Sequence, residues 1–537
     1  MSKSDAANSA SISQLYEQAL SAHHQGQLTA AKALYLLLIK QKPHHFDALH
    51  HLCMIAMHEQ QLEQALQWIN LALAQNPQHA VAHANRGIVL YYLKQYSQAV
   101  SSYERAIRLN PQYAQAYCNR GIALRQLGRL EEAERSYDKA IALQADYAEA
   151  YANRGNVRLK LQQFDLALED QQRAVRLRPK QANYLCNRGT VLHALQQFSP
   201  ALKDFNLAIQ LQADHAGAYL NRAMLQLLQG QWDNAWQDYE WRLRLPELAW
   251  QLRDIPRWRG VQSLQGKNVL LHAEQGLGDT LQFCRYCTLL AELGAQVYLW
   301  VQATLLPLLN QLPQLRAIGA LSIVSQHTPD LPSDWPAMDY QVSLLSLPLI
   351  FKTDLSSVPF ARGYLTADPG RLQAWQQRLP TAAAKRIGLV WRGSPTHEND
   401  RQRSISLQVL CSDLIRGLAD CDIAWISLQI DHSRQEQALL RQYQIQEVSE
   451  HLTDFAETAA LCAGLDAVIT VDSAVAHLAG ALSRPTYLLL AYTPDWRWLL
   501  QRADTPWYRS VQLYRQDDQR NWSSVLARLR ADLSRLF

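Results

Sequence analysis

A turn with two glycines and an aspartate follows an apolar run near the middle of the chain. In "HAEQGLGDTLQF" (272–283), Gly276, Gly278 and Asp279 precede a helix-like stretch that begins at about residue 280. Glycine permits positive φ and lets a ligand approach the backbone closely. A carboxylate at such a turn can act as a general base, although aspartate is also a good helix cap. The spacing is not G-x-G-x-x-G, so it argues against a nicotinamide-dependent oxidoreductase.

Two later segments carry groups that suit a diphosphate. The loop in "GLVWRGSPTHENDRQRSIS" supplies hydroxyl, amide and guanidinium groups, which bind phosphate oxygens. The segment "VITVDSAVAHLAGAL" passes directly from a strand into a helix, whose first backbone amides form an anion site. The candidate residues are Gly393, Ser394, Arg401, Arg403, Asp472, Ser473, Ala474 and His477. The alternatives are a solvated basic loop, a helix N-cap at Asp472 and a packed core histidine at His477.

The elements that carry these groups are predicted to be parallel strands. After Gly266, short β-rich runs alternate with amphipathic stretches, a pattern typical of parallel sheets covered by helices on both faces. The predicted strands are "NVLL", "QVYLWV", "LSIV" and "YQVSLL", followed by "RIGLVW", "IAWISL", "AVITV" and "PTYLLLA". A segment near 368–385 divides them into two doubly wound domains, which form a ligand cleft at the carboxyl ends of their strands. The amphipathic stretch at 520–537 is expected to brace the first of these domains.

The first half of the chain repeats one helical unit. Seven copies with a period of 34 residues fit between about 15 and 252. Alanine recurs in phase where two helices must cross closely, and proline ends the second helix of four units. These residues are Ala31, Ala65, Ala99, Ala133, Ala167, Ala201 and Ala235, and Pro43, Pro77, Pro111 and Pro179. The pattern resembles the tetratricopeptide repeat, which implies a right-handed superhelix of helix pairs with a concave groove.

A row of asparagines stands in phase on the first helix of five successive units. Its members are Asn85, Asn119, Asn153, Asn187 and Asn221, each followed by an arginine. Asparagine is a poor helix former, so the row needs a reason. Each amide can bond a neighbouring repeat, or the row can bind the backbone of an extended peptide. The row resembles the asparagine ladder in the repeats of protein O-linked N-acetylglucosamine transferase. The arginines can equally be stems packed along the helices with solvated heads.

The second half resembles the heptosyltransferase-like glycosyltransferases, which have the two-domain GT-B architecture. The matching landmarks are "GLGD", the "WRGSP" loop, and "VDSAVAHLAGAL" followed by "PTYLLL". The resemblance implies Asp279 as the base near the acceptor hydroxyl, and Ser394 with Arg401 or Arg403 on the donor phosphates. It places Asp472, Ser473, Ala474 and His477 around the donor diphosphate and sugar, and Gly278 beside them. Those enzymes use a lysine where this chain has arginines, and a glutamate on the ribose where it has Gln429.

The resemblance implies an inverting glycosyltransferase that needs no metal and no cofactor. Its partners are a nucleoside-diphosphate sugar and, through the repeat groove, a protein or peptide acceptor. The alternative is an interaction scaffold whose C-terminal half keeps the fold without the activity. Trp496, Trp498, Trp507 and Tyr508 can stack on a sugar or nucleobase, although such residues more often pack an interdomain surface.

The composition and the N-terminal residues limit the partners and the location that we expect. The net charge of +4 on 537 residues argues against general nucleic-acid or membrane binding. The N-terminus has no secretory signal and no stretch is apolar enough to span a membrane, so a cytoplasmic protein is expected. The predicted fold class is an all-α repeat superhelix followed by two facing Rossmann-like domains. The predicted segments are a polar tail (1–14), repeats (15–252), a connector (253–267), an acceptor-side domain (268–380) and a donor-side domain (381–537).

Overall fold

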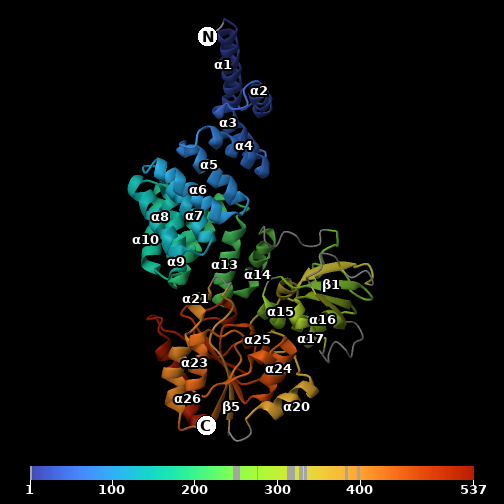
Figure 1. Cartoon of the computed structure of the whole chain (residues 1–537). Helices are drawn as coiled ribbons and strands as arrows, with labels where there is room; N and C mark the ends of the chain where they lie inside the picture. Colours follow the sequence, from blue (N-terminus) through green and yellow to red (C-terminus); the bar gives the residue numbers. More distant parts are fainter. Residues whose placement is uncertain are drawn as a thin grey trace. The chain divides into compact units, whose positions relative to one another are not determined.

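The computed structural model of the chain divides into two compact units, Met1–Val191 and Leu192–Phe537. It is shown in Figure 1 with colours that follow the sequence. The residues described are 3–245, 254–274, 276–310, 321–325, 331, 335–380, 385–395 and 399–536. Among these residues, no helix combines the length and the apolar character that crossing a membrane requires.

The first unit consists of helix pairs, with one pair in each 34-residue repeat. Its helices are α1 (Lys3–His24), α2 (Leu28–Gln41), α3 (Phe46–His58), α4 (Leu62–Gln75), α5 (Ala80–Tyr92), α6 (Tyr96–Leu109), α7 (Ala114–Gln126), α8 (Leu130–Leu143), α9 (Ala148–Lys160), α10 (Phe164–Leu177) and α11 (Ala182–Ala194), the last of which crosses the unit boundary. Helices α2, α4, α6 and α10 each end two residues before a proline, because the residue before proline disfavours helical backbone. The repeat superhelix predicted from the period is confirmed.

Small residues bring the two helices of each repeat into close contact. The seven in-phase alanines, from Ala31 to Ala235, are fully buried. A Cβ added to Gly87 would lie 2.5 Å from the Tyr103 ring, and one added to Gly121 would lie 2.6 Å from the Tyr137 ring. The crossing distance therefore requires alanine or glycine at these positions.

Four of the arginines that follow the ladder asparagines join neighbouring repeats. In α9, Arg154 bonds Asp138 on α8 at 2.7 Å and Asp170 on α10 at 2.6 Å. The same spacing of sixteen residues joins Arg86 to Asn70 and Ser102, Arg120 to Glu104 and Ser136, and Arg222 to Asn206 and Asp238. The interpretation of these four arginines as stems with solvated heads is wrong, because each head is held by partners on two second helices.

The second unit contains two fully parallel sheets. The first comprises β1 (Asn268–His272), β2 (Gln296–Val301), β3 (Leu321–Ser325) and β4 (Tyr340–Ser343) in the order β3-β2-β1-β4. The second comprises β5 (Lys385–Val390), β6 (Ile423–Ser427), β7 (Gln446–Glu447), β8 (Ala467–Val471), β9 (Thr486–Leu490) and β10 (Val511–Arg515) in the order β10-β9-β8-β5-β6-β7. All eight predicted strands are present. Two further strands, β7 and β10, were not predicted. Strand β7 has only two residues, and the sequence of β10, "VQLYR", mixes polar and apolar residues.

Helices pack around both sheets. They include α15 (Leu277–Phe283), α16 (Cys287–Glu292), α17 (Leu306–Leu309), α19 (Leu347–Ile350), α20 (Pro369–Arg378), α21 (Asp400–Arg403), α22 (Leu407–Leu410), α23 (Arg434–Gln442), α24 (Phe455–Gly464), α25 (Ala474–Ala481) and α26 (Trp522–Leu536). The prediction that the last of these braces the first domain is wrong. Its buried residues Val525, Leu529 and Leu533 join a core cluster with Leu414 and Leu489 of the second domain.

The last repeats belong to the same compact unit as the sheets. These repeats comprise α12 (Phe198–Leu211), α13 (Ala216–Leu228), α14 (Trp232–Tyr239) and a 3-10 turn, η1 (Glu240–Arg244). Trp232 and Trp236 lie in one core cluster with Val269 of β1 and Trp507. The compact boundary therefore falls at residue 191, inside α11, whereas the helices of the repeat pattern continue to η1, which ends at Arg244.

The connector between the repeats and the first sheet is ordered where it is described. Trp258 is buried, donates from Nε1 to Gln262 O at 3.0 Å, and meets Phe351 edge to face. The backbone of Trp258 also donates to Gln341 O on β4 at 2.9 Å. Residues 246–253 of the predicted repeat end and connector lie outside the described residues.

Candidate functional site

Two short helices meet where the two α/β domains join. A Cβ added to Gly278 of α15 would lie 2.7 Å from His477 Cδ2 and 3.7 Å from Ala474 Cα, both on α25. Gly278 is therefore required by the packing of one helix on the other. Neither glycine uses the positive φ that this residue type permits, because Gly276 has φ −88° and Gly278 lies inside α15.

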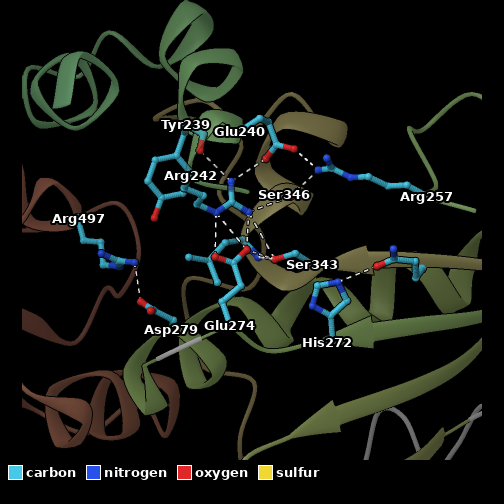
Figure 2. A network of polar contacts seen from close by, with 12 residues as sticks. Tyr239, Glu240, Arg242, Arg257, His272, Glu274, Asp279, Ser343, Ser346 and Arg497 are labelled. Atoms are coloured by element: carbon cyan, nitrogen blue, oxygen red, sulfur yellow. Dashed lines mark hydrogen bonds and ion pairs between the residues drawn. The ribbon is translucent and has the colours of Figure 1, made fainter. Parts of the chain in front are cut away.

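Asp279 lies in the first turn of α15 and points toward the second domain. Figure 2 shows its carboxylate directed at Arg497, whose NH2 donates to Asp279 Oδ1 at 2.6 Å. The same carboxylate accepts the backbone N–H of Gly276, so it also serves the helix end. Burial raises the pKa of Asp279 above its usual value, and the positive charge of Arg497 offsets only part of that rise. The side chain is 25% exposed.

Arg497 ties the two domains together at this point. It lies in η9 (Trp496–Trp498) and is 7% exposed. Its Nε donates to Gln282 Oε1 at 2.7 Å and its NH1 to Asp495 Oδ1 at 2.8 Å, in addition to the bond to Asp279. Arg497 was not among the site residues predicted from the sequence. Its place between two tryptophans could have indicated a role, because a charged residue that faces a core must be paired.

The C-terminal aromatic residues pack the junction. Trp496, Trp498, Trp507 and Tyr508 are each at most 3% exposed. Trp507 stacks on Trp232 of α14 with ring centroids 5.2 Å apart. The interdomain-packing alternative is therefore correct for these residues, and in this structure they do not offer a face to a sugar.

The start of α25 carries the second group of candidates. Asp472 and Ser473 follow β8 directly and are half-buried, as is Ala474. Burial raises the pKa of Asp472 to about 6, with a further rise from Asp495 and an opposing effect from Arg403. Ser473 is the N-cap residue, and its Oγ lies 3.0 Å from Thr470 Oγ1.

His477 is a packed histidine. It is 5% exposed, its Nδ1 lies 2.9 Å from Tyr508 Oη, and its ring stacks on Trp498. Burial, together with the nearby arginines, holds the pKa of His477 well below its usual value, so the ring is neutral at pH 7. The core-histidine alternative is therefore correct as to packing, while the ring also lies directly against Gly278 of the facing helix.

The predicted phosphate loop contributes one arginine to this region. Gly393 N–H donates to Ser404 Oγ at 3.2 Å, and a Cβ added to Gly393 would lie 2.4 Å from Arg403 NH2. Arg403 is within electrostatic range of Asp472 and His477. Arg401 and Ser394 are exposed. Of the two candidate arginines, Arg403 is therefore the one that the fold brings toward α25.

Gln429 follows β6, as the sequence placed it. Its backbone N–H donates to Ser427 Oγ at 3.2 Å. Its side-chain Oε1 is buried and has no hydrogen-bond partner among the described residues. A buried acceptor without a donor is rare in native structures, so a donor group on a ligand would suit this position.

A buried network behind Asp279 was not foreseen. Glu274 follows β1 and forms a forked pair with Arg242 of η1, with Arg242 NH2 2.6 Å from Oε1 and Nε 2.9 Å from Oε2 (Figure 2). Ser343, at the end of β4, also donates to Glu274. Burial alone would raise the pKa of Glu274, but Arg242 and these hydrogen bonds outweigh it and lower the pKa. Glu274 is therefore a buried carboxylate at the carboxyl end of the first sheet.

The asparagine row is half-buried along its length. Asn85 Nδ2 lies 2.8 Å from His50 Nε2 on the preceding repeat, and Asn153 bonds Cys118 at the equivalent spacing. Two of the five amides thus link neighbouring repeats, although through side chains and not through backbone. Peptide binding by the row remains a prediction.

Comparison with known proteins connects these two regions to families. Residues 16–80, 85–148 and 118–182 match the tetratricopeptide repeat, and residues 440–524 match glycosyltransferase family 9 (heptosyltransferase). The chain joins tetratricopeptide repeats to a glycosyltransferase family 9 domain. The segment that matches glycosyltransferase family 9 includes Asp472, His477 and Arg497, while Asp279 lies outside it.

A curated relative has a similar architecture. Protein FlbA of Caulobacter vibrioides is 26% identical over 321 residues, which are 56% of this chain and 52% of FlbA. The chain thus spans about half the length of that relative. Among solved structures, a tetratricopeptide repeat protein from Parabacteroides merdae is 19% identical with a TM-score of 0.39, covering 43% of this chain and 91% of its own. PilF of Pseudomonas aeruginosa is 23% identical with a TM-score of 0.33, covering 37% and 90%.

Proposed function

We propose that the protein transfers a sugar from a nucleoside diphosphate to a hydroxyl or amide of a protein or peptide acceptor. The observation that carries the proposal is the pairing of Asp279 with Arg497 beside α25. It brings the one candidate base of the first domain against the segment that matches glycosyltransferase family 9. The pair with Arg497 also stabilises the junction, so the transfer assay on an Asp279 variant, and not the pair alone, separates the enzyme from a scaffold.

The proposed reaction is a single displacement. The acceptor oxygen or nitrogen forms a bond to the anomeric carbon while the bond from that carbon to the phosphate oxygen breaks. Asp279 takes the proton from the acceptor, and the nucleoside diphosphate leaves with the electron pair. The raised pKa of Asp279 makes its carboxylate a better base than an ordinary aspartate. The outcome is inversion at the anomeric carbon, and no step requires a metal.

The leaving diphosphate needs positive groups and N–H donors. Arg403 acts electrostatically on both Asp472 and His477, and α25 begins directly after Ser473, so its first amides lie beside Asp472. Hydrogen bonds aimed at a charge that develops in the transition state are usually the largest single contribution to catalysis. Asp472 suits this environment only when protonated or paired, because an ionised carboxylate repels a diphosphate.

The repeats supply the acceptor. Tetratricopeptide repeats form extended surfaces that suit protein partners. The half-buried asparagine row is the proposed contact to an extended peptide backbone, with each amide able to donate and accept. Changing Asn119, Asn153 and Asn187 to alanine should weaken a protein acceptor far more than a small one. Equal effects on both acceptors would assign the row to repeat packing alone.

The central test is a thermal-shift screen of the full chain with nucleoside diphosphates and nucleotide sugars. A ligand that binds only the folded state stabilises it by about 2.7 kcal/mol at a hundred times its Kd. The donor found in this way is then incubated with a peptide pool, and transfer is read as an added sugar mass. Asp279→Asn should abolish transfer and leave the donor-induced shift nearly intact.

A matched control distinguishes the loss of the proposed base from the loss of a carboxylate elsewhere in the protein. Asp504→Asn removes a carboxylate that pairs with Arg502 on an exposed loop, and it should change neither donor binding nor transfer. The absence of a shift with every nucleotide would favour the non-catalytic scaffold. Full turnover in Asp279→Asn would remove Asp279 as the base.

A further inference from the structure

The seventh repeat departs from the others at one buried position. Five successive units place a fully buried alanine at the same point of the second helix, and these are Ala72, Ala106, Ala140, Ala174 and Ala208. The next position in phase is Arg242, which is 3% exposed. A buried charge is costly unless it is paired, so the exchange of a methyl group for a guanidinium needs a partner outside the repeat.

That partner lies at the edge of the first sheet. Arg242 donates to both carboxylate oxygens of Glu274, which follows β1. Its NH2 also donates to Ser346 Oγ, just after β4, at 2.9 Å. Its NH1 donates to Glu240 Oε1 at 2.8 Å and to Tyr239 O at 3.0 Å within its own turn. Figure 2 shows this guanidinium enclosed by groups from η1 on one side and from the ends of two strands on the other.

Helix α14 of the same repeat touches both α/β domains. Trp236 Nε1 donates to Thr353 O of the first domain at 2.8 Å, and its ring meets Trp496 of the second domain edge to face at 5.4 Å. Trp232 stacks on Trp507, also of the second domain. The seventh repeat is therefore packed into the junction at which Asp279 and Arg497 meet, and its tryptophans share a core with that junction.

The link from Arg242 to Asp279 is short along the chain. Glu274 follows β1, and Asp279 lies in the first turn of α15, five residues further along the chain. Arg242 pairs with the first of these carboxylates and Arg497 with the second.

We propose that the seventh repeat is needed for sugar transfer. In this proposal Arg242 is a positioning residue, which acts through Glu274 to hold the start of α15 and with it Asp279. The catalytic meaning of this inference rests on the proposed function. The mechanical part, that a repeat residue holds the first turn of α15, does not.

Hydrogen exchange on the full-length protein tests the mechanical part without any substrate. Arg242→Ala installs the residue that five other repeats carry at this position, so the repeat itself can accommodate it. The amides of α15 (277–283) should exchange about tenfold faster or more, while those of α25 (474–481) change by less than about twofold. Arg242→Lys keeps the positive charge but loses the two-point hydrogen bonding to Glu274, so the exchange rate in α15 should lie between those of the wild type and Arg242→Ala.

Arg222→Ala is the matched control. Arg222 also joins two second helices through a charged pair, with Asp238, but it has no contact with Glu274. Exchange in α15 should be unchanged in this variant. With donor and acceptor in hand, Arg242→Ala should lower kcat with little change in the donor KM, whereas Arg222→Ala should not.

Two results would overturn the inference. One is a folded Arg242→Ala protein whose α15 amides exchange at the wild-type rate. The other is equal acceleration in α15, α25 and the strands, which would mean general destabilisation. A negative nucleotide screen combined with faster exchange confined to α15 would instead refute the proposed function and leave the positioning contact standing.

Discussion

The ion pairs of Arg497 lead to a quantitative prediction for the free energy of unfolding. Its side chain is 9% exposed, and its guanidinium bonds Asp279 at 2.6 Å and Asp495 at 2.8 Å. Arg497→Met keeps most of the side-chain volume and removes the charge, which leaves two neighbouring carboxylates without their shared partner. Removing one member of a buried ion pair costs about 3–5 kcal/mol. Since the Asp279 side chain keeps 25% exposure, the low end of that range, about 3 kcal/mol, is expected at pH 7.5.

The loss should depend on pH, with a defined sign. Burial already raises the pKa of Asp279 in the folded protein, and the loss of Arg497 raises it further. A carboxyl group whose folded-state pKa exceeds its unfolded value destabilises the fold when ionised. This penalty grows as the pH rises from the unfolded-state pKa to the folded-state pKa, is complete above the folded-state pKa and vanishes below both. The variant should therefore be closer to wild type at pH 5 than at pH 7.5.

Urea denaturation at both pH values measures the difference directly. Arg502→Met is the matched control, because it breaks a surface pair with Asp504 whose contribution should be about 0–1 kcal/mol. A loss in Arg497→Met as small as that of the control, or a loss equal at pH 5 and pH 7.5, would refute the view that Arg497 neutralises buried carboxylates at the junction.

Three further predictions concern other parts of the molecule. The raised pKa of Asp472, about 6, implies that affinity for a nucleoside diphosphate falls by up to about tenfold per unit as pH rises through 6, and that calorimetry on Asp472→Asn shows a weaker dependence. Ala133→Leu overfills a fully buried helix crossing and should destabilise the first compact unit by about 1–3 kcal/mol, read from its urea transition. Trp236→Ala should cost about 3–5 kcal/mol in the second unit, and a loss confined to the first unit would contradict the division at residue 191.

The architecture was readable from the sequence to a large extent. The period of 34 residues fixed the repeats because each unit buries the same small residues, and these alanines are indeed fully buried. Eight strands were found because a strand buried on both faces of a parallel sheet must be continuously apolar. Strand β10 escaped because it is only partly buried and carries polar residues, so its sequence has no such signal.

The candidate site was readable only in part. The turn at Asp279 and the start of α25 were visible because a strand, a turn and a helix are local in sequence. Arg497 and Glu274 were not found, since their meaning lies in partners 218 and 32 residues away. Gly278 was noticed as a residue that lets a ligand approach, and the structure adds a packing role, which the sequence cannot distinguish from a ligand-binding one.

The sequence by itself determined the repeat period, the two parallel sheets and the residue types at the turn and at the start of α25. These depend on hydrophobic periodicity and local backbone chemistry, which each segment carries within itself. Only the tertiary structure decided that the aromatic residues near the C-terminus pack inward, that α26 covers the second domain, and that the last repeat shares a core with the sheets. Those outcomes depend on which buried surfaces and charges meet across long sequence separations, and a buried arginine reveals its role only when its carboxylate partner is beside it.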